Sequence, residues 1–455
     1  MRAPLLSRDQ TSVGLAICAI AAIACLAPVH NDTWWHLAYG REMASQGGFA
    51  QVDRFSHTAY GAAFPNHQWL GARVLYAVYA VGGLPLLTGM CAGLLTLTWA
   101  LCWRLSSGPT LERLAVLATA AAASTLAWSV RPQVFTLALL PFTVLLLVRG
   151  RYLAVPLVMG LWANLHGGVL LGLVVVATWT AVMALQRAAG WQRCAVALAL
   201  GSAATLVTPL GLQYWPEIFA SLRRSQVHRL HEWQPAAWPP NHPAFWVLAL
   251  GLVGFCWTRW RLLDTTAKRA LAASAIVLLP VAARSQRNIA AFALLAGPAV
   301  THLLGSRATG GIEASRPTRA AAWLLATSAA AAAALVLVAW QRPLDRLGWR
   351  PLTDGAVAAI EACPGRLYNG YADGGPIIWF VPEKKVFLDS RQDQFPAGLI
   401  AEATAVELGA DPWPLFERHS IACAAVPPSS PVARTLEDAG WQTRYSDETW
   451  RVLSR

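Results

Sequence analysis

Long apolar runs dominate the first three quarters of the chain, and short polar or basic stretches separate them. A helix that crosses a bilayer needs about 20 predominantly apolar residues. The runs that approach this length predict eleven membrane-spanning helices: 11–29, 84–103, 111–130, 132–149, 152–165, 167–186, 192–208, 243–259, 268–283, 287–304 and 319–340. The first run has no small-residue cleavage site after it, so we interpret it as an uncleaved span.

One further apolar stretch, 69–82, is short for a span, and counting it as one would invert every later loop. The positive-inside rule decides between the two topologies, because Lys and Arg accumulate in short cytoplasmic loops. The basic residues fall on the cytoplasmic side only if 69–82 is a juxtamembrane or re-entrant helix. We therefore predict two long outer loops, 30–83 and 209–242.

The composition changes after the last span. The hydrophobicity falls, and basic and acidic residues occur in similar numbers. Asp373-Gly374-Gly375 predicts a turn, and Val386-Phe387-Leu388 predicts a short buried strand. We expect a transmembrane module over 1–343 and a small soluble extracytoplasmic α/β domain over 344–455. Four charged residues flank the strand-like segments of the tail, and we favour surface salt bridges over acceptor selection for them: Asp373, Asp389, Arg391 and Asp393.

The overall composition excludes a soluble enzyme and a disordered chain. Of the 455 residues 56% are hydrophobic and 13% are charged, whereas a soluble domain has about 25% charged residues. The net charge of +12 divides into +16 over 1–343 and −4 over 344–455. The positive charge lies between the spans and orients them, so we predict no nucleic-acid partner. The spacing of Cys363 and Cys423 leaves open whether they pair.

Polar residues that carry chemistry gather on the predicted outer side, which holds nine of the ten histidines. Asp32 stands out because it follows the first span and precedes Trp34 and Trp35. A carboxylate desolvated by two indoles is suited to act as a general base. The same position equally fits a carboxylate that caps a helix end in front of an aromatic belt. The sequence leaves both interpretations open.

The first outer loop carries further candidates for the site. Asp53 is a second carboxylate, and four other residues are candidates for substrate binding: His36, His57, His67 and Trp69. Asp32, His36, Asp53, His57 and His67 together offer a possible site for a divalent metal, but they have no recognised metal-ligand spacing. We therefore predict no metal and no cofactor, with a divalent metal as the alternative.

The later outer segments add cationic and aromatic candidates, namely Arg131, His166, Glu232, Trp233, Arg284 and Arg287. Arginine grips phosphate with two parallel hydrogen bonds, and the aromatic and acidic side chains suit sugar rings. Each arginine also fits an interfacial anchor, and the second loop also fits an aromatic belt segment that lies on lipid.

Several segments resemble the GT-C glycosyltransferase superfamily of bacterial polytopic proteins. The first outer loop is the specific part, with Asp32–Leu37, Asp53–Thr58 and His67–Leu70. Ordered support comes from Arg131–Gln133, Trp162–Gly168, Thr208–Gly211, Glu232–Pro235, Asn369–Gly375 and Val386–Arg391. The resemblance implies an all-α polytopic membrane bundle of about 11 transmembrane helices with a small C-terminal extracytoplasmic α/β domain. It also implies placement in the bacterial cytoplasmic (inner) membrane.

The resemblance further implies transfer of a sugar from a polyprenyl-phosphate donor to a saccharide, lipid or protein acceptor. The base of such enzymes maps to Asp32. The family's paired acids are absent because Thr33 and Trp34 follow Asp32, so Asp53 is the candidate for a second acid. We expect an inverting, metal-independent transfer to an acceptor hydroxyl on the extracytoplasmic face. Two alternatives remain: a transporter or flippase for lipid-linked saccharides, and a non-catalytic scaffold with the same fold.

Overall fold

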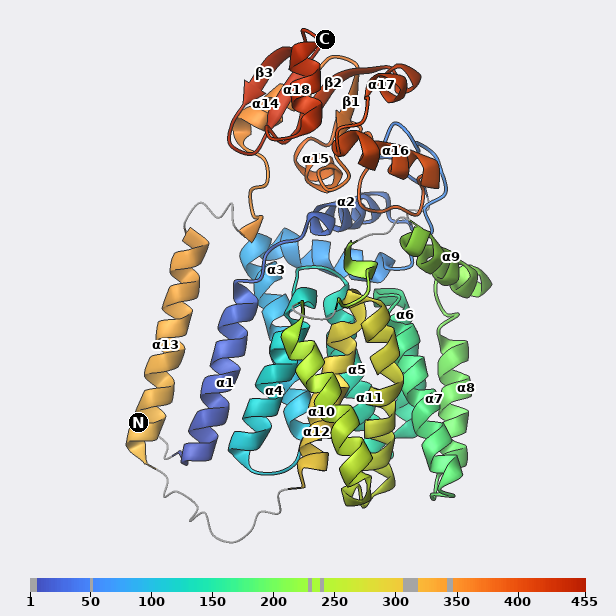
Figure 1. The fold of residues 1–455 in the computed structure, drawn as a ribbon, viewed down its shortest axis with the longest axis vertical. Helices are drawn as coiled ribbons and strands as arrows, with labels where there is room; N and C mark the ends of the chain where they lie inside the picture. Colours follow the sequence, from blue (N-terminus) through green and yellow to red (C-terminus); the bar gives the residue numbers. More distant parts are fainter. Residues whose placement is uncertain (1–5, 50–51, 228–230, 238–240, 306–317, 342–346) are drawn as a thin grey trace. The chain divides into compact units, whose positions relative to one another are not determined.

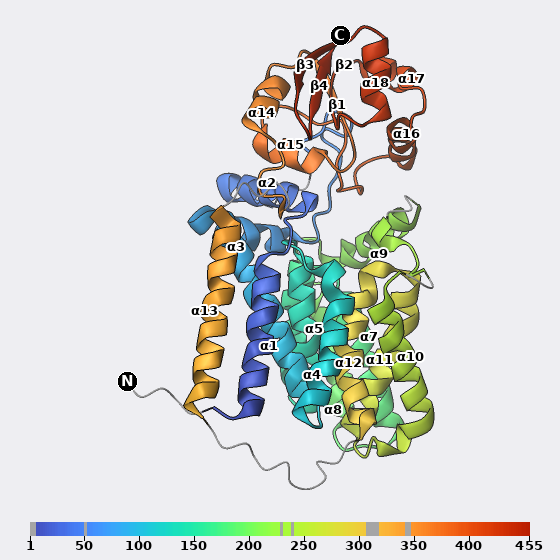
Figure 2. The same ribbon diagram turned by 60° about the vertical axis from the view of Figure 1, so that its left-hand side comes forward.

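The computed structural model describes residues 6–49, 52–227, 231–237, 241–305, 318–341 and 347–455. The chain forms two compact units. The helical unit comprises Met1–Ala27, Gly82–Gly211 and His231–Arg342, and the mixed unit comprises Pro28–Val81, Leu212–Leu230 and Pro343–Arg455. Figures 1 and 2 show the helices of the helical unit running side by side along a common direction.

A helix occupies each apolar run that predicts a span. These are α1 (Arg8–Cys25), the second part of α3 (Trp69–Leu105), α4 (Thr110–Ser124), α5 (Gln133–Val148), α6 (Val155–Leu165), α7 (Val169–Leu185), α8 (Trp191–Ala204), α10 (Pro243–Arg259), α11 (Thr266–Arg284), α12 (Ile289–Leu304) and α13 (Arg319–Gln341). Helix α12 forms the centre of the unit, because it packs against α4, α10 and α11 and is buried over almost its whole length. Helix α1 packs against α13.

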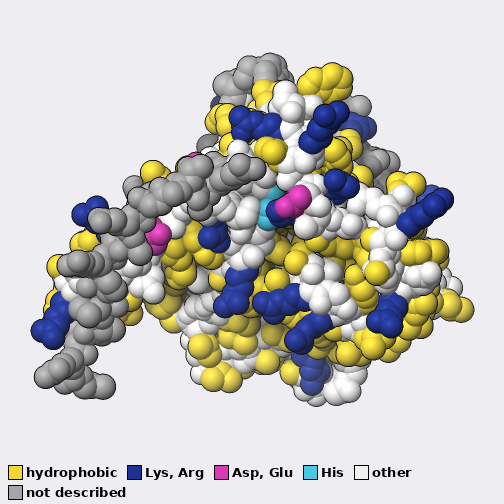
Figure 3. Space-filling model, turned by 90° about the horizontal axis from the view of Figure 1, so that it is seen from below, with side chains coloured by type: hydrophobic (Ala, Val, Ile, Leu, Met, Phe, Trp, Pro, Cys, Tyr) yellow, Lys and Arg dark blue, Asp and Glu magenta, His cyan; other side chains and the backbone are white. Residues whose placement is uncertain are grey.

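The helical unit has the surface of a membrane protein. Large apolar side chains point outward, including Leu153, Leu157 and Trp257. In the described part of the chain, five helical stretches are long and apolar enough to cross a bilayer: α1, α3, α11, α12 with its preceding turn, and α13. The other predicted spans form shorter helices, so the count of eleven stays a prediction. Figure 3 shows Lys and Arg side chains gathered on one face of the molecule, where acidic side chains are few.

Helix α3 is interrupted at Gly82 and Gly83. Gly83 has φ of 61°, which lies in the left-handed region that favours glycine, and Pro85 follows without a backbone N–H to donate. The break separates 69–81, which belongs to the mixed unit, from the rest of α3, which belongs to the helical unit. The sequence pattern also predicts that the 69–82 helix ends and the 84–103 span begins at these glycines. Whether 69–81 lies at the membrane surface stays a prediction.

The mixed unit contains a four-stranded sheet with the order β1-β2-β4-β3. Its elements are β1 (Arg366–Asn369), β2 (Ile421–Val426), β3 (Gln442–Ser446) and β4 (Arg451–Ser454), with helices α14 (Asp354–Glu361), α15 (Gly374–Phe380), α16 (Ala397–Glu407), α17 (Trp413–His419) and α18 (Pro431–Asp438). Strands β1 and β2 are parallel, and the other two pairs are antiparallel. Alternate residues of β2 enter different cores: Cys423 and Ala425 lie in one, and Ala424 and Val426 lie in the other.

The two predicted outer loops contain helices that the sequence pattern does not indicate. Helix α2 (Asn31–Gln46) lies in the first loop, and α9 (Tyr214–Val227) lies in the second. Helix α2 is buried from Thr33 to Gly40, which means that more than one of its faces is covered. A helix of this kind lacks a one-sided apolar stripe, so its sequence shows no clear helical period.

The predicted strand at Val386–Leu388 is wrong, although all three side chains are buried. Val386 makes only an isolated bridge to Ser56. The side-chain amide of Asn369 takes the place of a neighbouring strand. It accepts from the Phe387 N–H at 2.8 Å and donates to the Leu388 carbonyl at 2.8 Å. The segment therefore satisfies its backbone without joining the sheet.

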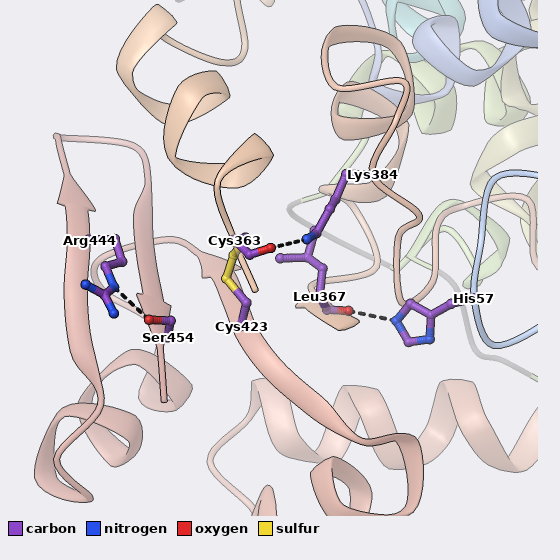
Figure 4. Close-up of a disulfide and its surroundings, with 7 residues drawn as sticks. All are labelled: His57, Cys363, Leu367, Lys384, Cys423, Arg444 and Ser454. Atoms are coloured by element: carbon purple, nitrogen blue, oxygen red, sulfur yellow. Dashed lines mark hydrogen bonds between the residues drawn. A yellow bond between two sulfur atoms is a disulfide. The ribbon is translucent and has the colours of Figure 1, made fainter. Parts of the chain in front are cut away.

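A disulfide joins Cys363 to Cys423 in the mixed unit, with a Cα–Cα distance of 5.9 Å (Figure 4). It ties β2 to the chain that leads into β1. The Lys384 ammonium donates to the carbonyl of Cys363, and Nε2 of His57 lies 2.8 Å from the carbonyl of Leu367. The first outer loop thus contacts the strand that begins beside the disulfide.

Candidate functional site

Asp32 lies in the first turn of α2, and His30 is the N-cap of that helix. Nδ1 of His30 accepts the Asp32 N–H at 3.1 Å and lies 3.3 Å from Oδ2 of the Asp32 carboxylate. The Asp32 side chain is 18% exposed. The positive end of the α2 dipole lies beside this carboxylate. The sequence places Asp32 at the outer end of the first span, whereas α1 ends at Cys25 and Asp32 lies in the first turn of α2, where the capping side chain is that of His30.

The Asp32 carboxylate accepts a hydrogen bond from the hydroxyl of Ser390, a residue 358 positions further along the chain. The same hydroxyl accepts the indole N–H of Trp35 at 3.2 Å. Trp34 instead packs against Phe380, with ring centroids 4.8 Å apart. Ser390 is absent from the candidates that the sequence provides. The only signal for it is its place in the Val386–Arg391 segment of the family resemblance.

Asp53 is fully buried and forms an ion pair with Arg391, whose guanidinium is also fully buried. Nη1 of Arg391 lies 2.7 Å from Oδ1 of Asp53 and 2.7 Å from the hydroxyl of Tyr39. The other side of the guanidinium binds Asp389, with Nε 2.7 Å from Oδ1. Burial raises the pKa of Asp389, and the charge of Arg391 opposes that rise. These contacts hold Asp53 in a buried ion-pair network, and its role as a second catalytic acid stays a prediction.

The prediction of surface salt bridges in the tail is therefore partly wrong. Arg391 and Asp389 do form an ion pair, but neither side chain is exposed. Asp393 pairs with Arg224 at 3.2 Å, and its side chain is 9% exposed. The charges are buried because first-loop residues cover this part of the tail, as the Asp53 ion pair illustrates.

The remaining first-loop candidates lie in the mixed unit in different environments. His36 is buried, and the centre of its ring lies 3.5 Å from that of Trp35, with the two rings tilted by 32°. Burial lowers the pKa of His57. His67 lies 3.2 Å from the Gln68 amide, and Trp69 begins α3 with its ring against Phe49. Among the residues that the structure describes, no three His, Cys, Asp or Glu side chains form a metal-ligand group. Substrate contacts of these four residues stay predictions.

In the helical unit, Glu232 brings together two of the predicted arginines. Its Oε2 lies 3.5 Å from Nη1 of Arg131, and its Oε1 pairs with Nη1 of Arg287. Arg131 is buried, and its Nε donates to Ser129 at 2.9 Å. The Arg287 guanidinium lies 5.3 Å from the centre of the Trp233 ring. The Glu232 carboxylate therefore holds both guanidiniums in place.

The turn between α11 and α12 positions Arg287 against the Glu232 segment. The N–H of Gln286 donates to the carbonyl of Gln234 at 3.0 Å. Ser285 donates its hydroxyl to the carbonyl of Glu232 at 3.4 Å. Arg284 is exposed at the end of α11. A phosphate contact of Arg284 stays a prediction.

His166 is buried at the end of α6, and its neighbours fix its tautomer. Nδ1 accepts the N–H of Gly168 at 3.0 Å and lies 2.8 Å from the hydroxyl of Thr136. That hydroxyl accepts the Trp162 indole at 2.8 Å, so its own proton is available to Nδ1. The proton of the neutral imidazole therefore lies on Nε2. Position 168 needs glycine, because an added Cβ would lie 2.8 Å from Nδ1 of His166.

In the mixed unit the carboxyl groups of Asp373 and Glu407 lie close to one another, which the sequence does not predict. Asp373 and Glu407 flank Gly370, where an added Cβ would lie 2.7 Å from Asp373 and 3.1 Å from Glu407. Burial, followed by the charge of Glu407, raises the pKa of Asp373 to about 7. Burial also raises the pKa of Glu407, and the Tyr371 N–H, which donates to Glu407 Oε1 at 2.7 Å, opposes that rise. Asp373 therefore holds a proton below about pH 7.

Asp373→Asn is expected to raise the stability of the protein near pH 8 and to change it little near pH 4. The folded chain keeps the Asp373 proton at pH values where the unfolded chain has lost it. Stability therefore falls as the pH rises from about 4 to 7, by up to about 1.4 kcal/mol for each unit of pKa difference. Thermal unfolding in detergent at the two pH values measures the effect. The exposed Asp438→Asn variant is the control, and an equal shift in both variants would contradict this account.

The fold of the chain is similar to the folds of two GT-C glycosyltransferases, AglB and ArnT. Archaeal oligosaccharyltransferase AglB from Archaeoglobus fulgidus, in complex with an inhibitory peptide and a dolichol-phosphate, matches with a TM-score of 0.60 and 11% identity, over 92% of this chain and 70% of AglB. ArnT from Cupriavidus metallidurans in the apo state matches with a TM-score of 0.53 and 15% identity, over 97% of both chains. ArnT bound to undecaprenyl phosphate matches with a TM-score of 0.53 and 14% identity, over 97% of both chains.

The likeness at these identities is one of fold. No protein-family model matches the sequence, and no curated protein matches it. The fold agrees with the resemblance that the first outer loop indicates.

Proposed function

We propose that this protein transfers a sugar from a polyprenyl-phosphate donor to an acceptor hydroxyl on the extracytoplasmic face of the bacterial inner membrane. Asp32 takes the proton of the acceptor hydroxyl. The hydroxyl oxygen forms a bond to the anomeric carbon, and the bond from that carbon to the phosphate oxygen breaks. The lipid phosphate leaves with the electron pair, and attack from the opposite face inverts the anomeric configuration.

The observation that carries this proposal is the Asp32 carboxylate at the N-terminus of α2, held by Ser390, in a chain with a GT-C fold. A positioned carboxylate within reach of a hydroxyl proton is what general-base catalysis requires. The ligands bound in two structures of similar fold support this class of donor. AglB holds a dolichol-phosphate, and ArnT holds undecaprenyl phosphate. A donor of this kind places the reaction at a membrane.

Arg131 and Arg287 are the proposed partners of the leaving phosphate. Their shared carboxylate, Glu232, fixes both guanidiniums before the donor binds. Preorganised positive charge of this kind stabilises the charge that develops on a leaving group. His166 contributes the proton on Nε2 as a further donor, and Arg284 supplies additional positive charge.

The remaining candidates are proposed to bind the sugar and the acceptor. They are His36, His57, His67, Trp69 and Trp233, whose rings and polar atoms suit saccharide hydroxyls and ring faces. The acceptor class remains a saccharide, a lipid or a protein. No metal ion takes part in the proposed step, in which arginine charge stabilises the leaving phosphate.

A panel of undecaprenyl-phosphate monosaccharides with radiolabelled sugars tests the proposed transfer. Membranes that contain the protein are incubated with each donor, with and without a chelator, and the label is followed. The proposal predicts that one label moves onto a second molecule and that the chelator has no effect. Label that crosses the bilayer while still bound to its carrier would identify a transporter instead.

The Cys363–Cys423 disulfide supports an extracytoplasmic tail. Disulfides persist in oxidising compartments such as the periplasm.

We expect both cysteines to be oxidised in cells, and Cys363→Ser to lower the unfolding free energy by about 2–4 kcal/mol. The reason is that the bridge closes a sequence separation of 60 residues and so restricts the unfolded chain. Alkylation with a mass tag before and after reduction measures the pairing, and thermal unfolding measures the stability. The buried membrane thiol Cys91 supplies the control for alkylation through Cys91→Ser. Free Cys363 and Cys423 in freshly lysed cells would contradict this placement.

A further inference from the structure

The hydroxyl of Ser390 lies between two side chains from the first turns of α2. The indole Nε1 of Trp35 donates to Ser390 Oγ at 3.2 Å, and Ser390 Oγ donates to Oδ1 of Asp32. An indole N–H is only a donor, so it occupies a lone pair of the hydroxyl. The hydroxyl proton is thereby directed to the carboxylate. The chain of hydrogen bonds has one direction, from Trp35 through Ser390 to Asp32.

The backbone around Ser390 is anchored on both sides. The hydroxyl of Tyr371 donates to the Ser390 carbonyl at 3.1 Å. The next residue is Arg391, whose buried guanidinium is held by Asp53 and Asp389. These contacts leave the Ser390 side chain little freedom, so its bond to Asp32 has a defined geometry.

Two glycines at the start of α15 allow α2 and the Ser390 segment to approach that helix closely. A Cβ at Gly374 would collide with the carbonyl of Leu388, and a Cβ at Gly375 would collide with the carbonyl of Asn31. Helix α15 therefore packs against both the residue that precedes Asp32 and the segment that leads into Ser390. This packing fixes the separation between the hydroxyl and the carboxylate.

We propose that Ser390 is a positioning residue for the base Asp32, and that Trp35 orients the Ser390 hydroxyl. The inference rests on the proposed function, in which Asp32 is the base. Ser390 binds Oδ1, so it fixes the rotation of the carboxylate. Orientation of a reacting group in this way contributes to turnover and not to substrate affinity.

Turnover of an undecaprenyl-phosphate-linked hexose by the full-length protein tests the role of Ser390. Ser390→Ala is expected to lower kcat about tenfold, the loss of one hydrogen bond to a charged group, with KM for the donor unchanged. Ser390→Thr keeps the hydroxyl and restores most of the rate. Trp35→Phe lowers kcat about threefold in the wild-type background and causes no further loss in Ser390→Ala, since Trp35 acts through Ser390.

The matched control is Ser45→Ala, which removes an exposed hydroxyl from the same helix and is expected to leave kcat unchanged. Wild-type kcat in Ser390→Ala, or a rise in KM alone, would overturn the inference. Independent, multiplying losses from Trp35→Phe and Ser390→Ala would also overturn it. If Asp32→Asn abolishes transfer and Ser390→Ala does not slow it, this inference fails while the proposed function stands.

A measurement without substrate tests the hydrogen-bond chain itself. In protein with ¹⁵N-labelled tryptophan, the indole signal that Trp35→Phe removes identifies Trp35 among the 22 tryptophans. We expect that signal to shift in Ser390→Ala and in Asp32→Asn, and to stay in place in Ser45→Ala. An unmoved Trp35 signal in Ser390→Ala would show that the chain does not exist, whatever the activity of Asp32→Asn.

Discussion

Asp32→Asn is expected to lower the rate of sugar transfer by about 10²–10⁴-fold, which is the usual contribution of a positioned general base. Asparagine has the same shape and still accepts the hydrogen bond from Ser390, but it cannot take a proton from the acceptor. Donor binding is expected to remain, because the proposed phosphate partners are Arg131 and Arg287. Initial rates of label transfer and donor binding to the purified variant measure the two effects separately.

Asp9→Asn is the matched control for this variant. Asp9 also lies in the first turn of a helix, α1, and its side chain is exposed. We expect wild-type rates from Asp9→Asn. Transfer at the wild-type rate by Asp32→Asn would remove Asp32 as the base, whereas unfolding of the variant, detected by its thermal midpoint, would show that the carboxylate has a structural role.

Arg391→Met is expected to destabilise the mixed unit by about 3–5 kcal/mol, the usual cost of leaving buried charges without their partner. The guanidinium forms ion pairs with two fully buried carboxylates, Asp53 and Asp389. It also donates to Tyr39 and lies over the rings of Phe55 and Phe64. Methionine fills part of the volume but supplies no charge. Thermal unfolding and protease resistance of the purified protein measure the loss.

Arg418→Met is the control for Arg391→Met, because Arg418 pairs with Glu402 at 2.7 Å and both side chains are about half exposed. An exposed ion pair contributes about 0–1 kcal/mol. Equal stability losses in the two variants would mean that the Arg391 network is not the element that joins the first loop to the tail.

The apolar pattern predicts the helices of the helical unit well. Each of those helices is bounded by turns or charged loops, and a run of apolar residues is the dominant constraint on a chain in a bilayer. The break at Gly82 and Gly83 is also predictable, since two glycines before Pro85 interrupt a helix. Helix α2 is not predictable in this way. Its N-terminal acid Asp32 and the terminal Gly47 are the only local signals, because the helix is covered on more than one side.

The residues of the candidate site also differ in whether the sequence predicts them. Residue type and the resemblance single out Asp32, and charge near apolar ends singles out Arg131 and Arg287. Ser390 and Arg391 lie in a segment of the resemblance, but the sequence does not indicate their partners, because these are residues more than 300 positions away. Glu232 is predicted as a sugar-binding group, but its pairing with two arginines depends on packing between loops. Long-range partners of this kind require the folded chain.

The most direct test of the account quantifies both products of the reaction in one vessel. Purified protein in proteoliposomes receives a radiolabelled undecaprenyl-phosphate hexose and a membrane extract as the source of acceptor. The account predicts that undecaprenyl phosphate and transferred sugar appear in equal amounts with the wild-type protein and that neither appears with Asp32→Asn. Donor recovered intact on the opposite leaflet, with no undecaprenyl phosphate released, would contradict it.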